Sequence, residues 1–246
     1  MNEQVLLAVS MMTVGQAALC ITLLISRATQ HPSNIPLALF FFASGVIAVT
    51  PVIAKVSPLF LVPYFALNLF AWLSISPILW LYISALTSQV PWQLQKRDSL
   101  HFIPLVFALG VSLLILNLST AEERAIFVEG QDINSGYPLM VVLGVFISIL
   151  IWLVQSSVYA LKIVRRLLAY QRQLKQHFAN NDNRELVWVY WVLAVVGLVW
   201  LSMVLMILAD MLGDVYLFGS IIGALLSLIL VWPFDLWGLR QEPGFD

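Results

Sequence analysis

Long stretches without a charged residue dominate the pattern of polar and apolar positions along the chain. Seven of them are close to or above the roughly 20 residues that a helix needs to cross a bilayer: residues 4–26, 35–54, 59–88, 102–118, 137–161, 186–209 and 215–232. Runs such as ISILIWLV are apolar throughout, whereas strands of a membrane barrel alternate apolar and polar residues. The pattern predicts an all-α polytopic membrane protein with seven transmembrane helices. Residues 1–238 are expected to form this domain, and residues 239–246 a cytoplasmic tail or the start of a linker.

The charged residues between these stretches predict the orientation, because cytoplasmic loops of membrane proteins are enriched in Lys and Arg. With the N-terminus outside, ten of the twelve Lys and Arg residues fall on the inner side, and only Lys55 and Arg124 stay outside. Seven spans then bring the C-terminus into the cytoplasm, and the expected location is the inner (cytoplasmic) membrane of the cell. Trp80 and Tyr82 fall near the inner end of the third stretch, where we expect aromatic anchors.

Composition excludes a soluble domain of this length. Hydrophobic residues make up 61% of the chain and charged residues 10%, and the mean hydropathy is +0.93. Soluble proteins have about 25% charged residues, because their surface faces water. Cys20 is the single cysteine, which excludes a disulfide within the chain. Lys55 and Asp210 lie at the outer ends of their stretches, and the lack of an ionisable residue at mid-membrane argues against a proton-coupled transporter.

Uncharged polar side chains inside the stretches are the candidate ligand-binding residues. Asn68, Trp72 and Ser76 recur at every fourth position and therefore share one helix face. Asn117 and Gln155 complete the set, and Asn68 and Gln155 are expected to face the bundle because an amide in lipid needs a partner. Two interpretations stay open. These side chains line a pocket for a small ligand, or they form hydrogen bonds between helices, which contribute about 0.6 kcal/mol each on average.

Prolines carry two different predictions. Pro63 and Pro77 are expected to kink the third helix and to free backbone carbonyls, which suits a cavity. Pro36, Pro104 and Pro138 fall in the first turn of their predicted helices, where proline is a favourable starting residue.

A basic segment, KIVRRLLAYQRQLKQHFANNDNRE at residues 162–185, follows the fifth stretch. Its apolar residues recur at helical spacing, so it is expected to continue the fifth helix as an amphipathic extension that ends at the ANNDN sequence. The candidate contacts with the inner leaflet or a signalling partner are Arg165, Arg166, Arg172 and Lys175. The segment is interpreted either as a solvated inner loop or as a lever that carries motion to a cytoplasmic partner.

The sequence contains no recognisable catalytic or metal-binding pattern. His31, His101 and His177 are far apart and form no HxxxH or HExxH pair. The chain has no GxSxG, P-loop or GxGxxG sequence. We therefore expect no enzymatic activity, no catalytic residue, no metal and no cofactor.

Two adjacent segments carry a family resemblance: SPILWLYISALTS at residues 76–88 and WQLQKRDSLHFIPLV at residues 92–106. They contain a P-x-x-x-x-Y stretch, a basic loop and an HF-[IL]-P sequence that opens the next helix. The sequences LVWVYWVL and WGLRQ further along agree with the same pattern. Together they resemble the membrane portion of bacterial transcriptional regulators in which transmembrane helices precede a C-terminal AraC-type DNA-binding domain.

The resemblance implies a sensory membrane module that binds a small or lipid-derived signal. It would report to a DNA-binding domain that is absent from this chain, so no direct contact with nucleic acid is expected from these residues. Expected partners are membrane lipid, a small-molecule signal and, as an option, a second copy in a homodimer. The alternative hypothesis is a small-solute transporter or channel-like protein. A third hypothesis is a membrane scaffold.

Overall fold

The computed structural model describes residues 2–29, 31–88, 93–119, 122 and 136–177, together with six helical positions between 194 and 204. The described part is helical, and five helices are long and apolar enough to cross a membrane. The elements are α1 (Asn2–Ser26), α2 (Asn34–Val56), η1 (Pro58–Phe60), α3 (Leu61–Leu86), η2 (Lys96–Phe102), α4 (Ile103–Leu116) and α6 (Gly136–His177). These helices identify the chain as a multi-pass membrane protein by their length and composition.

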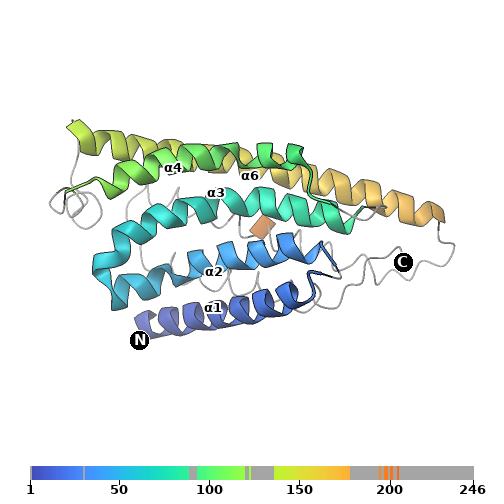
Figure 1. Ribbon diagram of the computed structural model, residues 1–246, viewed down its shortest axis with the longest axis horizontal. Helices are drawn as coiled ribbons and strands as arrows, with labels where there is room; N and C mark the ends of the chain where they lie inside the picture. Colours follow the sequence, from blue (N-terminus) through green and yellow to red (C-terminus); the bar gives the residue numbers. More distant parts are fainter. Residues whose placement is uncertain are drawn as a thin grey trace.

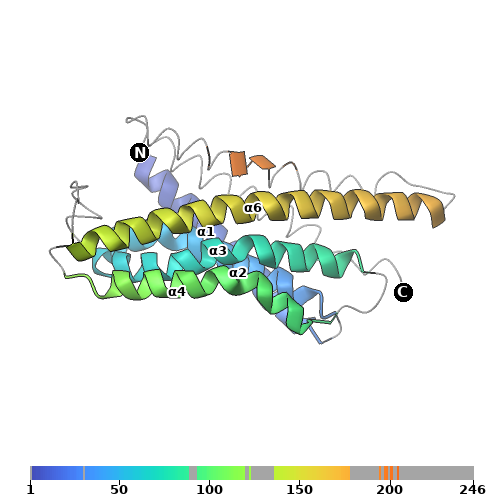
Figure 2. The ribbon, with the colours of Figure 1, turned by 90° about the horizontal axis from the view of Figure 1, so that it is seen from above.

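The helices lie side by side along one long axis (Figure 1). α1 packs on α2 and α2 on α3, while α3 also contacts α4 and α6, which contact each other. Successive helices run up and down, so α3 and α6 point in the same direction (Figures 1 and 2). α3 is the central helix. In its most apolar part 56% of the residues are buried, compared with 22% in the corresponding parts of α4 and α6.

Two clusters of buried side chains hold the bundle together. One joins α1, α2 and the second half of α3, and includes Phe40 and Phe41, which are 1% and 0% exposed. The other joins the first half of α3 to α4 and α6 around Leu73, Val111 and Val141. Large apolar side chains such as Phe42 and Val106 stay exposed on the outer faces of the helices. That distribution suits a bundle whose outside faces lipid.

Helices α4 and α6 approach each other closely at Gly144. A Cβ atom added at Gly144 would lie 3.1 Å from a methyl group of Val111. Gly144 and Ser148 are buried one turn apart on α6, and the Ser148 hydroxyl donates to the Gly144 carbonyl at 2.8 Å. Small residues at this spacing let membrane helices approach closely.

The first five predicted spans coincide with helices α1, α2, α3, α4 and α6, give or take a few residues at their ends, except for the extension of α6. The predicted spans at residues 186–209 and 215–232, and the tail, lie outside the described residues except for the six helical positions. The orientation in the membrane stays a prediction.

Two local expectations were wrong. Pro63 is the third residue of α3, which begins after the short helix η1, so Pro63 belongs to the first turn and only Pro77 is inside the helix. Tyr82, expected as an interfacial anchor, is 3% exposed and belongs to the core with Phe40 and Phe41. It packs in the core because it lies on the same face of α3 as the buried Ile78 and Leu79.

Helix α6 is much longer than a membrane crossing requires. It has 42 residues, which corresponds to about 63 Å at 1.5 Å per residue. The hydrocarbon core of a bilayer is about 30 Å thick. α6 extends past the end of α3 in both views (Figures 1 and 2). The basic segment up to His177 therefore continues the fifth helix without a break.

Candidate functional site

Polar and aromatic side chains recur along the contact between the parallel helices α3 and α6. We call this set the α3–α6 seam and define it as Trp72, Trp80 and Ser84 of α3 and Thr87 at its C-terminal end, with Trp152, Gln155, Ser156, Tyr159, Lys162 and Arg166 of α6. Hydrogen bonds across it join residues separated by 79 to 82 positions. This nearly constant offset is expected for two parallel helices in register.

The first half of α3 is bonded to α2 beside a proline of α2. Pro51 has no N–H, so it leaves the Ile47 carbonyl without its helical partner. The Thr50 hydroxyl donates to that carbonyl at 2.7 Å and accepts a hydrogen bond from the Asn68 amide nitrogen at 3.0 Å. Tyr64 adds a second link, since its hydroxyl donates to the Val46 carbonyl.

The middle of the seam is organised around the second internal proline. Pro77 frees the Leu73 carbonyl, and the Gln155 side-chain nitrogen of α6 donates to that oxygen at 3.2 Å. Next to this bond, the Trp72 and Trp152 rings pack edge to face with their centroids 5.2 Å apart. A polar bond and an aromatic pair thus join α3 to α6 at mid-helix.

Trp200 also reaches the seam. Its indole nitrogen donates to the Ser156 hydroxyl at 2.9 Å. Trp200 belongs to the sixth predicted span, so this position of the later sequence packs against α6.

The far end of the seam is basic. Arg166 donates from Nε to the Thr87 hydroxyl at 2.6 Å and from a terminal nitrogen to the Ser84 carbonyl at 3.3 Å. His101 of η2 is hydrogen-bonded through Nδ1 to the Tyr159 hydroxyl at 2.7 Å. Lys162 lies between these pairs, with its ammonium 5.1 Å from the centroid of the Tyr159 ring.

Several buried acceptors in the bundle have no hydrogen-bond partner among the described residues. They include Asn68 Oδ1 and Gln155 Oε1, the second polar atoms of the two amides that link the helices. Asn68 is 6% exposed. A buried polar atom without a partner is costly, so these two oxygens are candidates for contact with a ligand or a water molecule.

The seam includes two of the five residues predicted to bind a ligand, Trp72 and Gln155. Asn68 bonds Thr50 of α2 instead, and Ser76 is half-buried on α3. Asn117 does not belong to the seam, because it is exposed at the end of α4 and its amide donates to the Leu113 carbonyl of its own helix at 2.7 Å.

The predicted basic residues of the extension separate into different environments. Arg166 is half-buried in the seam, whereas Arg165 and Arg172 are exposed. The side chain of Lys175 lies outside the described part of α6. Ile163 and Leu167, on either side of Arg166, are 4% exposed and join the core cluster of α1, α2 and α3. The first turns of the extension therefore pack on the bundle.

Sequence reasoning missed the roles of Thr50, Tyr159 and Lys162. A Thr–Pro pair inside an apolar helix is a usable signal, because the hydroxyl can satisfy a carbonyl that the proline frees. The pairing of Tyr159 with His101 depends on how η2 meets α6, for which the sequence has no local sign.

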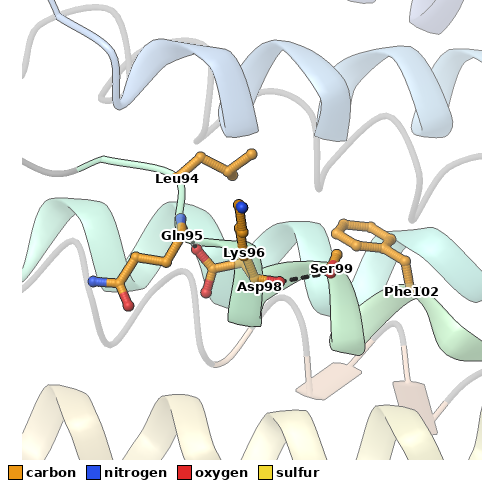
Figure 3. Close-up of a pocket in the computed structure, with 6 residues that line it drawn as sticks. All are labelled: Leu94, Gln95, Lys96, Asp98, Ser99 and Phe102. Atoms are coloured by element: carbon orange, nitrogen blue, oxygen red, sulfur yellow. Dashed lines mark hydrogen bonds between the residues drawn. The ribbon is translucent and has the colours of Figure 1, made fainter.

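A hollow of about 490 Å³ lies beside η2, at the same end of the bundle as Arg166. Figure 3 shows the lining side chains of Leu94, Lys96 and Phe102 on the same side of η2. Asp98 accepts a hydrogen bond from the Gln95 backbone at 2.8 Å and thereby caps the turn. Most of the lining side chains are exposed, so this is an open surface depression.

Within the described residues, no group of three or more His, Cys, Asp or Glu side chains is placed to hold a metal ion. No protein-family model matches the chain, and no curated protein or solved structure matches it either.

Proposed function

We propose that the chain is the sensory membrane module of a bacterial transcriptional regulator. In this proposal a small or lipid-derived signal binds at the α3–α6 seam and is reported to a cytoplasmic DNA-binding domain. The family resemblance of residues 76–106 supports the regulatory role. The observation that carries the proposal is the bond from Gln155 to the Leu73 carbonyl, because it ties the centre of the bundle to the helix that extends beyond it.

The input site in this proposal is the middle of the seam together with the preceding turn of α3, which carries Asn68. Asn68 and Gln155 each use the amide nitrogen to bond another helix and keep a buried oxygen without a described partner. A ligand with a hydrogen-bond donor and an apolar body fits such acceptors beside the Trp72 and Trp152 rings. Binding there competes with or reinforces the contacts that fix α6 against α3.

The output in this proposal is the extension of α6. A small rotation or shift of α6 at Gln155 moves the residues up to His177 as part of the same continuous helix. Arg166 is the last described polar tie to α3, through Thr87 and Ser84. Packed helices shift between discrete arrangements by 1–2 Å in known switches, so a modest change at the seam suffices.

The test compares two single substitutions in the chromosomal gene, Gln155→Leu and Val154→Leu. Gln155→Leu removes the seam bond, whereas Val154 is 66% exposed on the same helix and is the matched control. With equal membrane abundance by immunoblot, Gln155→Leu is expected to change a defined set of transcripts several-fold, and Val154→Leu to leave them as in the wild type.

Unchanged transcripts in the Gln155→Leu strain would contradict the sensory role. The same two variants are then reconstituted in proteoliposomes. Solute flux that Gln155→Leu alters, with transcripts unaffected, would favour a small-solute transporter instead.

A further inference from the structure

Two cationic side chains flank a single tryptophan ring at the basic end of the seam. The Lys162 ammonium lies 6.0 Å and the Arg166 guanidinium carbon 5.7 Å from the centroid of the Trp80 ring. Both cations come from consecutive turns of α6, and Trp80 comes from α3. The face of an indole ring attracts a cation at about this range, so Trp80 gathers two positive charges at one place, which in turn attracts an anion.

The described carboxylates do not supply that anion. Asp98 and Glu122 are the two acidic side chains that the structure describes, and neither forms an ion pair with Lys162 or Arg166 in that part of the chain. Asp98 instead accepts a bond from the Gln95 backbone, and Glu122 accepts bonds from Ser119.

Arg166 keeps donors for a further partner. A guanidinium has five N–H donors, and the described acceptors of Arg166 are the Thr87 hydroxyl and the Ser84 carbonyl. Those two bonds hold the guanidinium in place beside Trp80. They also fix the orientation of its remaining N–H donors. A fixed guanidinium suits an anion with several oxygens, such as a phosphate.

The position of Trp80, Lys162 and Arg166 relative to the membrane surface indicates which phosphate-containing molecule they bind. Ser84 and Thr87 lie at the end of α3, where the predicted orientation places the inner surface of the membrane. Trp80 is half-buried there, and an indole ring prefers the level of the lipid headgroups. Lys162 is exposed, so it faces the surrounding lipid rather than the core.

We propose that Trp80, Lys162 and Arg166 bind the phosphate of one anionic phospholipid of the inner leaflet. The site is a specific one and differs from the general attraction of a basic segment to an anionic surface. Arg165 and Arg172 carry the same charge on the same helix but are exposed, with no described aromatic partner. They are therefore matched controls for the charge change alone.

The test measures lipid retained by the purified full-length chain with native mass spectrometry, after extraction from vesicles of phosphatidylglycerol and phosphatidylcholine. The wild type is expected to keep one phosphatidylglycerol in preference to phosphatidylcholine, also in excess inorganic phosphate. Lys162→Gln and Arg166→Gln are each expected to lower that retention more than about five-fold, which exceeds the effect of one basic residue at an anionic surface. Arg165→Gln and Arg172→Gln are expected to lower it by that general effect at most.

Three outcomes would overturn the site. An equal loss in all four variants would mean that net charge alone attracts the lipid. Equal retention of both lipids would mean that no anionic headgroup is recognised, and displacement by inorganic phosphate would mean that the site binds free anions. Because Arg166→Gln also removes bonds to α3, Lys162→Gln decides the result if the Arg166 variant does not fold.

Discussion

The side-chain nitrogen of Gln155 donates a hydrogen bond, at 3.2 Å, to the Leu73 carbonyl that Pro77 leaves without a helical partner. The proline and the glutamine lie on different helices and complement each other. The proline of α3 leaves a backbone carbonyl without a donor, and the glutamine of α6 supplies that donor. This relationship makes a quantitative prediction about how the two residues are coupled.

Gln155→Leu is expected to lower the free energy of unfolding by about 1 kcal/mol, because the Leu73 carbonyl loses its donor. In a Pro77→Ala background, the new backbone N–H restores the helical bond, and Gln155→Leu is expected to have a smaller effect. A double-mutant cycle measured by denaturation in detergent gives the coupling. Equal effects of Gln155→Leu in both backgrounds would show that the two residues act independently.

The bond at Pro51 predicts an order of effects among three variants. Thr50→Val keeps the shape of the side chain but removes both the donor to Ile47 and the acceptor for Asn68. It is expected to lower the thermal stability more than Asn68→Leu, which removes one bond, while Thr50→Ser stays close to the wild type. Melting in detergent checks the order, and a Thr50→Ser protein as unstable as Thr50→Val would contradict it.

The close contact of α4 with α6 predicts a compensating pair. Gly144→Val places methyl groups where the Val111 side chain already lies, 3.1 Å from the position of a Cβ atom. Overpacking of this kind costs about 1–3 kcal/mol, and Val111→Ala is expected to recover much of it. Gly110→Val is the control, because nothing lies within 4 Å of its added Cβ atom. Equal losses for Gly144→Val and Gly110→Val would contradict the close approach.

Single cysteines at the two ends of α4 test the orientation. In a Cys20→Ala background, Asn117→Cys is expected to react with a membrane-impermeant maleimide added to the outer face of the inner membrane. Arg97→Cys is expected to react only after permeabilisation, because the distribution of Lys and Arg places η2 inside. Both positions are exposed in the structure. The reverse labelling would overturn the orientation.

The apolar stretches predicted the helices well, because a helix in lipid needs a continuous apolar run and little else. Asn68 and Gln155 were expected to face the bundle for the same reason, and they do. Asn117 carries the same amide but lies at the end of its helix, where it bonds its own backbone. The sequence distinguishes these cases only once the helix ends are known.

Sequence patterns could not predict which residues pair across the seam. Pro77 marks the Leu73 carbonyl as free, but the choice of Gln155 as its donor depends on how α6 is rotated and shifted against α3. The same rotation directs Arg166 to Thr87 and leaves Arg165 exposed. Adjacent arginines in one basic segment thus differ in role for a reason that the segment itself does not contain.

The distance between η2 and the extension of α6 tests the central claim, that the seam controls the position of that extension. Spin labels at Arg97→Cys and Arg172→Cys, in a Cys20→Ala background in liposomes, report this distance by pulsed electron paramagnetic resonance. Gln155→Leu is expected to shift or broaden the distance distribution, and Val154→Leu to leave it unchanged. Identical distributions in the parent, Gln155→Leu and Val154→Leu proteins would contradict the coupling of the seam to the extension.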